Sequence, residues 1–310
     1  MMVQALPFKL GQVAIAKWAP MMANLREPHA TRLYDGMLTA LIKEYAEDRG
    51  MMISIMAHAS PEQINGEYLA LKAHGFRRGI SLPYPDRYLV RLGLADDDQR
   101  ASFDQTWRRQ LHKAEKAGLT FERAKIEQLQ EFKELYSAMT SRKQFPDHSA
   151  YETLDQLMAL EEPVRPELFF VRKDNLLVAG ALIFKAGDRA AYLYGATNKH
   201  ALPLRAGYFL HWNIIRWLRD NTRARWYDLG GTDGFSGLHQ FKKGMVGHAG
   251  AIRALPPSAY YASKPMAYVM GAGALLAREA ILEVRRWVDA KRPTGAKPDL
   301  PRPNLDPDYA

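Results

Sequence analysis

Apolar positions in the first half of the chain alternate between the spacing of strands and the spacing of helices. The pattern predicts a hairpin over Val3–Trp18, an amphipathic helix over Arg32–Glu47 and a buried strand over Met51–Ala57. Ser60 is the expected cap of a second helix, and Tyr88–Leu94 is typical of a further strand. The element order is therefore β-β-α-β-α-β, which indicates an α/β arrangement.

A helix over Asp104–Ala117 leads into the second half of the chain, where a similar order returns. The later elements are expected to be helices Ile126–Lys143 and Tyr151–Leu160, strands Leu168–Arg172, Leu176–Phe184 and Ala190–Ala196, helix Arg205–Asp220 and strand Arg225–Leu229. Two halves with similar order suggest duplication of one fold. The expected class is α/β (of the α+β type) with two related domains.

The length of 310 residues agrees with two domains. We expect a first domain over residues 1–122, completed by residues 250–262, and a second domain over residues 123–249. A C-terminal helix is expected over 263–292. Five prolines in the last eighteen residues predict a disordered tail over 293–310.

The amino-acid composition mainly excludes certain classes of protein and of chemical site. The chain is 47% hydrophobic and 25% charged, with 43 Lys and Arg against 34 Asp and Glu, a net charge of +9. This balance is that of a globular protein and favours polyanionic partners. The absence of cysteine excludes disulfides, a thiolate nucleophile and Cys-ligated metals.

Neither a signal peptide nor an apolar run long enough to cross a bilayer is evident, so we expect a cytoplasmic protein. Met266–Val288 combines apolar and basic residues, and we expect it to dock on the domains. Contact with the inner face of the plasma membrane is the alternative for this segment. The histidines show no paired spacing, and we expect no bound metal and no resident cofactor.

One stretch is rich in candidate chemistry. A strand ending at Asp228 runs into a loop that contains Gly230 and Gly231, and a short basic segment with Lys242 and Lys243 follows. Glycines permit positive φ and a close approach of backbone to ligand. The stretch predicts a ligand-binding loop beside cationic donors, and a flexible connection is the competing interpretation.

Two basic features could recognise phosphate. Arg205 stands at the start of a helix, where a cation is unfavourable unless an anion is bound nearby. The helix before Gly118 carries a basic face that suits a phosphate backbone or is simply solvated. The residues of that face are Arg108, Arg109, Lys113 and Lys116.

Three ordered motifs resemble the FemAB family of peptidoglycan-bridge aminoacyltransferases. They are Tyr227–Gly231 with Gly237-Leu238 and Phe241–Gly244, the basic helix Arg108–Gly118, and the pair Ala191–Ala196 and Leu210–Trp212. The resemblance covers roughly residues 3–262. It implies two domains of the GNAT acyltransferase fold and transfer of an aminoacyl group from a charged tRNA to an amine, usually on a peptidoglycan precursor.

The resemblance also implies roles for single residues. Lys242 would steady the leaving ribose–phosphate end or the developing charge, and Phe241 would pack on the donor's terminal nucleotide. Arg205 would face phosphates of the donor or of the acceptor. Asp228 is the candidate proton acceptor, and capping of the glycine loop is a second possible role for it. Further substrate-binding candidates are Tyr194, Trp212, Gly230 and Gly231.

The family's first domain normally begins with a segment carrying Q-S-x-x-W, which we expect this chain to lack. An altered acceptor site or an internal start would explain the difference. The donor stays open, because Arg205-Ala206-Gly207 partly matches the pyrophosphate motif of acyl-CoA enzymes. Two competing hypotheses are a non-catalytic RNA-binding protein and an inactive relative of the family. The expected partners are a tRNA or CoA donor and a phosphorylated cell-envelope precursor.

Overall fold

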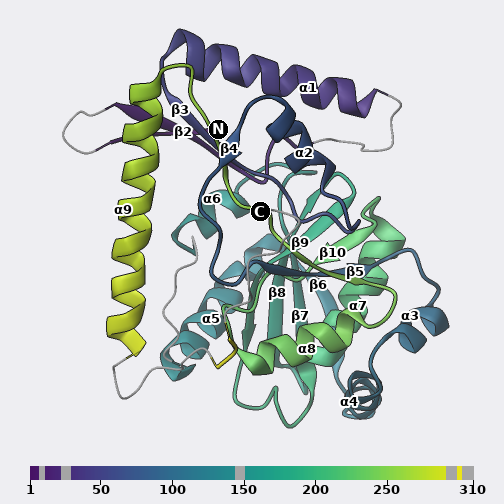
Figure 1. Cartoon of the computed structure of the whole chain (residues 1–310). Helices are drawn as coiled ribbons and strands as arrows, with labels where there is room; N and C mark the ends of the chain where they lie inside the picture. Colours follow the sequence, from purple (N-terminus) through teal and green to yellow (C-terminus); the bar gives the residue numbers. More distant parts are fainter. Residues whose placement is uncertain (7–10, 22–28, 144–150, 291–298, 302–310) are drawn as a thin grey trace. The chain divides into compact units, whose positions relative to one another are not determined.

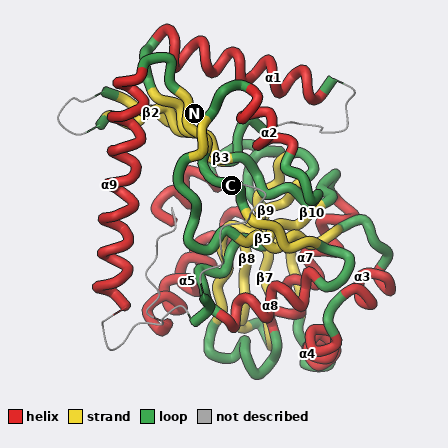
Figure 2. The backbone as a smooth tube through the Cα atoms, in the orientation of Figure 1, coloured by secondary structure: helices red, strands yellow, loops and turns green. Residues whose placement is uncertain are grey.

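The computed structural model describes residues 1–6, 11–21, 29–143, 151–290 and 299–301 (Figure 1). The chain divides into two compact units. Unit 1 comprises Met1–Arg87, Arg253–Pro293 and Pro301–Ala310, and unit 2 comprises Tyr88–Ile252 and Thr294–Leu300. Each unit is built on its own β-sheet (Figure 2).

Unit 1 is built on a five-stranded sheet with the order β1-β2-β3-β12-β4. The strands are β1 (Met2–Ala5), β2 (Gln12–Lys17), β3 (Met52–Met56), β4 (Arg77–Arg78) and β12 (Ala259–Tyr261). β1 and β2 form the predicted antiparallel hairpin, and β3 is the predicted buried strand.

Helices α1 (Ala30–Leu41), its continuation Ile42–Asp48 and α2 (Gly66–Ala73) share one core cluster with Ile53 and Ile55 of β3. Met52, which points to the opposite face of the strand, packs with residues of α9 (Pro265–Ala290). The docking expected for the C-terminal helix is therefore present within unit 1. Its exposed apolar residues include Met266, Val269 and Leu276, and membrane contact stays a prediction.

The predicted start of α2 was wrong. Ser60 lies in an irregular segment before a bend at residues 61–64, and the helix begins at Gly66 after Asn65, whose side chain accepts a hydrogen bond of 3.0 Å from the Tyr68 amide. A second polar residue that could cap the helix stood five positions further on, and sequence spacing did not choose between them.

Unit 2 contains a seven-stranded sheet with the order β11-β5-β10-β9-β8-β7-β6. Its strands are β5 (Asp86–Arg91), β6 (Thr120–Ala124), β7 (Glu167–Lys173), β8 (Leu176–Ala186), β9 (Arg189–Thr197), β10 (Trp226–Asp228) and β11 (Ala251–Ala254). The helices are α3 (Asp96–Ser102), α4 (Gln105–Glu115), α5 (Leu129–Lys143), α6 (Leu154–Met158), α7 (Ala206–Asn221) and α8 (Ser236–Val246), with short 3-10 turns at Ile126–Gln128 and Tyr151–Thr153.

Two layers of helix cover this sheet (Figure 1). Residues of α4, α7 and α8 share one core cluster, which includes Trp107, Ile214 and Met245. Residues of α5 and α6 share another, which includes Phe132 and Leu154. The predicted α/β class with two domains is confirmed.

The division between the units lies upstream of the boundary expected near residue 122. β5 pairs with β10 of unit 2, and Trp107 and Leu111 of α4 are buried in the core that α7 helps to form. Tertiary packing therefore assigns β5 and the basic helix to the second unit. Most of the tail predicted over 293–310 lies outside the described residues.

Across the described parts of the chain, we find no helix whose length and apolar character would let it cross a membrane.

Candidate active site

The chemistry predicted from the glycine-rich stretch gathers at the carboxyl end of β10. β10 runs parallel to β9 over Arg189–Ala191 and antiparallel to β5 on its other side. Beyond Ala191 the described pairing of β9 continues with β8 up to Thr197. The two parallel strands therefore part where β10 ends, a position at which α/β sheets commonly bind ligands.

Lys242 on α8 lies inside unit 2 and not on its surface. The residue is only 8% exposed, and its Nζ donates a hydrogen bond of 2.5 Å to the carbonyl of Gly231 in the glycine loop. The next residue, Lys243, is exposed to solvent. Burial and this hydrogen bond distinguish Lys242 from its exposed neighbour, and its predicted role toward a ligand stays a prediction.

His211 on α7 faces Lys242. Its Nδ1 lies 3.0 Å from the hydroxyl of Tyr227, and the side chain is buried. Burial, and secondly the charge of Lys242, lower the pKa of His211 to about 3. Burial likewise raises the pKa of Tyr227 well above its usual value. His211 and Tyr227 are therefore uncharged at neutral pH.

Aromatic side chains line the same region. The ring of Phe241 lies 5.0 Å from Tyr208 and 5.6 Å from His211, and Tyr192 lies 5.0 Å from His211. Phe241 is partly buried in the core cluster of α4, α7 and α8. Its predicted contact with a nucleotide stays a prediction, and the structure places it beside Lys242 as the motif requires.

Asp228 and Gly230 shape the loop itself. A side-chain oxygen of Asp228 accepts a hydrogen bond of 2.9 Å from the amide of Gly230, which adopts a φ of 77°. The second role weighed for Asp228, capping of the glycine loop, is thus observed. Its role as proton acceptor stays a prediction.

Arg205 lies at the start of α7, one residue before the helix, with a positive φ of 57°. Burial raises the pKa of Tyr208, and the positive charge of Arg205 opposes that shift, so the two side chains are neighbours. Because Tyr208 also contacts Phe241, Arg205 stands at the edge of the same group.

The structure places two other predicted site residues elsewhere. Trp212 stacks beneath the guanidinium of Arg100, 4.3 Å from the ring centre. Tyr194 packs with Tyr136 and Tyr151 in the core of α5 and α6. A register shift at Leu182/Ile183 sends Tyr192 and Tyr194 to opposite faces of β9. Tyr192, which belongs to the same motif but was not among the predicted site residues, is the tyrosine beside His211.

The basic face of α4 is exposed as predicted. Its residues Arg108, Arg109, Lys113 and Lys116 face solvent, while Trp107 and Leu111 are buried. Arg108 also donates a hydrogen bond of 2.7 Å to the carbonyl of Ala101. Both interpretations of this face, phosphate contact and solvated surface, fit this exposure.

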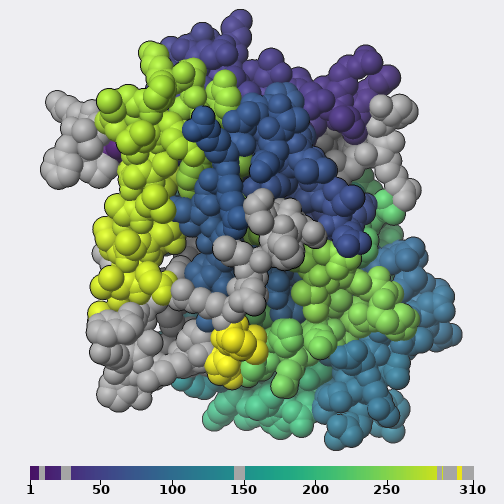
Figure 3. Space-filling model, viewed as in Figure 1, coloured from purple at the N-terminus to yellow at the C-terminus, as the bar shows by residue number. Residues whose placement is uncertain are grey.

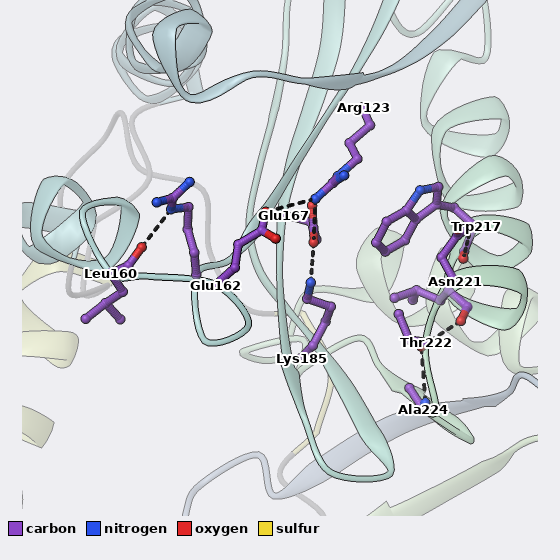
Figure 4. A network of polar contacts seen from close by, with 11 residues as sticks. Arg123, Leu160, Glu162, Glu167, Lys185, Trp217, Asn221, Thr222 and Ala224 are labelled. Atoms are coloured by element: carbon purple, nitrogen blue, oxygen red, sulfur yellow. Dashed lines mark hydrogen bonds and ion pairs between the residues drawn. The ribbon is translucent and has the colours of Figure 1, made fainter.

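A second polar cluster lies near the other edge of the sheet (Figure 4). Glu167 is buried and accepts a hydrogen bond of 2.5 Å from Arg123 Nε and a short one from Lys185. It borders a cavity of about 440 Å³ whose lining contains three acidic and three basic residues. The charges of this cavity are balanced, and it shares no residue with the group around Lys242.

Within the described ranges, no three His, Asp or Glu side chains come together as a metal site would require.

A comparison with protein-family models finds a match within unit 2. The family model described as an acetyltransferase (GNAT) domain matches residues 101–243, which lie within unit 2. The chain therefore contains a domain of the GNAT fold. Lys242, His211, Tyr227 and Arg205 all fall inside that match. No curated protein matches the chain in sequence.

Solved structures extend the likeness to the whole fold. The crystal structure of FemX shares 18% identity over 84% of this chain and 83% of that chain, with a TM-score of 0.68. The C-terminal domain of a putative lysylphosphatidylglycerol synthetase from Agrobacterium fabrum shares 15% identity over 90% and 88%, with a TM-score of 0.57. L-PGS from Bacillus licheniformis shares 14% over 88% and 85%, with a TM-score of 0.54. The predicted FemAB-like, tandem GNAT fold is thereby confirmed.

The neutral, buried His211 makes stability depend on pH. Because its pKa in the folded protein is about 3 and its ordinary value is 6.5, the unfolded chain takes up a proton first as pH falls. Stability from this residue is complete above pH 6.5 and is lost toward pH 3, at up to about 1.4 kcal/mol per pH unit. We expect His211→Gln to flatten this slope in urea unfolding measured between pH 7 and pH 4.5. The exposed His112→Gln should leave the slope unchanged, and equal slopes in wild type and His211→Gln would contradict the assignment.

Proposed function

We propose that the protein transfers an aminoacyl group from aminoacyl-tRNA to an amine of a phosphorylated cell-envelope precursor. The observation that carries the proposal is the buried ammonium of Lys242, held on the glycine loop at the carboxyl end of β10 in a GNAT domain. The FemX-like fold supports the same class of reaction.

The reaction needs little covalent chemistry from the protein. The nitrogen of the acceptor attacks the ester carbonyl of the donor and forms a tetrahedral intermediate with a negatively charged oxygen. The attack forms the C–N bond; collapse of the intermediate restores the C=O bond and breaks the C–O bond to the ribose, and the ribose oxygen leaves with the proton that the amine gives up. The Lys242 ammonium stabilises the negative charge on the carbonyl or ribose oxygen, which is most effective where water is excluded.

The start of α7 supports a donor other than acyl-CoA. Binding of a CoA pyrophosphate needs consecutive free backbone amides at this helix start. The amides of Leu204, Arg205 and Ala206 instead donate to the carbonyls of residues 200, 202 and 201, at 3.3, 3.1 and 2.9 Å respectively. The Tyr208 amide donates to the carbonyl of Arg205 at 3.0 Å. An aminoacyl-tRNA needs no such cradle, and the exposed basic face of α4 suits its phosphates.

Two observations support a phosphorylated envelope precursor as the acceptor, namely Arg205 and the structural relatives. Arg205 beside the aromatic group offers a fork for phosphate. One structural relative is a putative lysylphosphatidylglycerol synthetase, a name that joins lysine to a phospholipid. An N-acyltransferase that uses acyl-CoA is the second candidate, because the matching family model is described as an acetyltransferase.

A transfer assay with both donors tests this proposal. Labelled aminoacyl-tRNA and labelled acetyl-CoA are offered side by side with peptidoglycan precursors and amino sugars. We expect label on the acceptor from aminoacyl-tRNA and none from acetyl-CoA. Label from acetyl-CoA alone would establish the second candidate. Salt-sensitive tRNA binding without transfer would contradict both and favour a non-catalytic RNA-binding protein.

A further inference from the structure

Helix α9 is docked on unit 1 by one of its faces. Tyr268, Ala272 and Leu275 recur every three or four positions and pack with Met52 of β3. Between them, Gly271 lies so close to β3 that an added Cβ would stand 2.8 Å from the side chain of Met52. The opposite face is open to solvent, and Figure 3 shows α9, in lime to yellow, at the surface.

The open face is apolar along the length of the helix. Its large residues, which are 44% to 68% exposed, are Met266, Val269, Leu276, Ile281, Val284 and Val288. The exposed positions between them hold glycine, alanine and, among the side chains of α9 that the structure describes, a single charged residue, Arg278. A contiguous apolar surface of this length marks a contact with a partner or with lipid.

The size of this face is small for pairing with a second copy of the chain. A helix of 26 residues is about 39 Å long, so a face about 10 Å wide offers about 400 Å². A stable protein interface takes about 800 Å² from each partner. The glycine and alanine positions also leave gaps where a pair of helices would place large side chains. A lipid surface has no such requirement, because its binding strength grows with whatever apolar area is buried.

The charges that α9 exposes are complementary to an anionic surface. Of its described side chains, Arg278 is exposed, whereas Glu279 and Glu283 are only partly exposed. Lys264, directly before the helix, is exposed, and the exposed Arg77 stacks on a tyrosine of the helix at 5.4 Å. The chain as a whole carries a net charge of +9. Positive charge beside an apolar face favours an anionic bilayer over a neutral one.

We propose that the open face of α9 lies on an anionic lipid bilayer, with its apolar side chains at the boundary between headgroups and acyl chains. Because the other face is docked on unit 1, the helix lies in the plane of the lipid surface. The contact follows from unit 1 alone and does not depend on the transfer reaction proposed above. For an acceptor carried by a lipid, the same contact would bring the enzyme to its substrate.

Flotation of the full chain with lipid vesicles tests this contact. The probes are vesicles of pure phosphatidylcholine and vesicles of an equimolar mixture of phosphatidylcholine with phosphatidylglycerol. We expect the wild type to bind the mixture, and to bind pure phosphatidylcholine at least about tenfold more weakly. Leu276→Glu combined with Val284→Glu should weaken binding to the mixture at least about tenfold, because it places two charges on the apolar face.

Ile64→Glu combined with Leu69→Glu is the matched control. Ile64 and Leu69 are 69% and 55% exposed, against 59% and 61% for Leu276 and Val284, and they lie in unit 1 outside α9. The control adds the same two negative charges away from the proposed contact. We expect its affinity for the mixture to stay within about threefold of wild type, since distant exposed charges are screened by salt.

A fluorescent label locates the contact on the helix. The chain has no cysteine, so Val269→Cys creates a single attachment site for an environment-sensitive dye. The emission of this dye should shift to shorter wavelength when vesicles of the mixture are added. The same dye on Leu69→Cys should not respond.

The proposal is overturned if the wild type does not bind the mixture, or if the control loses as much binding as the α9 variant. A dye on Val269→Cys that is already shielded without vesicles, and unchanged by them, would overturn it too. Light scattering identifies a second copy as the occupant if the wild type is a dimer that Leu276→Glu with Val284→Glu makes monomeric, and that result would equally contradict the proposal. A failed transfer assay would leave all of these readouts intact.

Discussion

Replacing Lys242 by alanine is expected to lower the rate constant of acyl transfer by about a hundredfold to a thousandfold, with little change in KM. A loss of this size corresponds to removal of one fixed charge donor from a water-excluded site, about 3–4 kcal/mol of transition-state stabilisation. The reason is structural: the ammonium is buried, is hydrogen-bonded to Gly231, and lies beside a histidine that stays neutral. Steady-state kinetics with the competent donor measures the effect.

Lys243 gives the matched control. It follows Lys242 on the same helix but is exposed, so Lys243→Ala removes an equal charge without touching the site. We expect its rate constant to stay within about twofold of wild type, since exposed charges are screened by solvent. Lys242→Met keeps most of the side-chain packing and separates lost charge from lost burial. Transfer by Lys242→Ala at the wild-type rate would remove this residue from the reaction.

Replacing Gly247 by alanine is expected to cost about 3–5 kcal/mol of the free energy of unfolding, or to prevent folding. Gly247 ends α8 with φ 55° and ψ −151°, a conformation open essentially to glycine alone. A Cβ at this position would lie 1.8 Å from the carbonyl oxygen of Ser102, which is backbone and cannot rotate away. Urea unfolding measures the loss.

Gly237 in the same helix is the comparison. A Cβ there meets no heavy atom within 4 Å, and alanine favours helix over glycine by up to about 1 kcal/mol. Gly237→Ala should therefore be neutral or slightly stabilising. Similar unfolding midpoints for both alanine variants would show that the close approach at Gly247 does not exist in solution.

Local patterns predicted most of the second unit. The strands between residues 167 and 197, helix α7 and the return strand β10 follow from apolar periodicity and turn residues, which are properties of neighbouring positions. Thr120–Ala124 was not predicted as a strand, because its mixed polar sequence carries no alternation of its own and its pairing with β7 decides it. The unit boundary depends on that kind of distant pairing too.

In the candidate site, too, the sequence predicted local contacts and missed those between distant residues. Lys242 and the glycine loop were predicted because they lie within one short motif, and the structure joins them by a hydrogen bond. Tyr194 was predicted in place of Tyr192, since the irregularity in β9 that separates them leaves no mark in the sequence. His211 and Tyr227 pair between a helix and a strand, so the sequence alone does not predict this contact and the structure reveals it. An isolated histidine on the buried face of α7 was the available signal.

The most direct test of this account is a crystal structure with an aminoacyl-adenosine analogue whose ester is replaced by an amide that the enzyme does not cleave. The account predicts that Lys242 Nζ leaves the carbonyl of Gly231 and lies about 3 Å from the acyl carbonyl oxygen or from the ribose atom that replaces the ester oxygen. An analogue bound elsewhere, such as in the cavity beside Glu167, with Lys242 still bonded to Gly231, would contradict it.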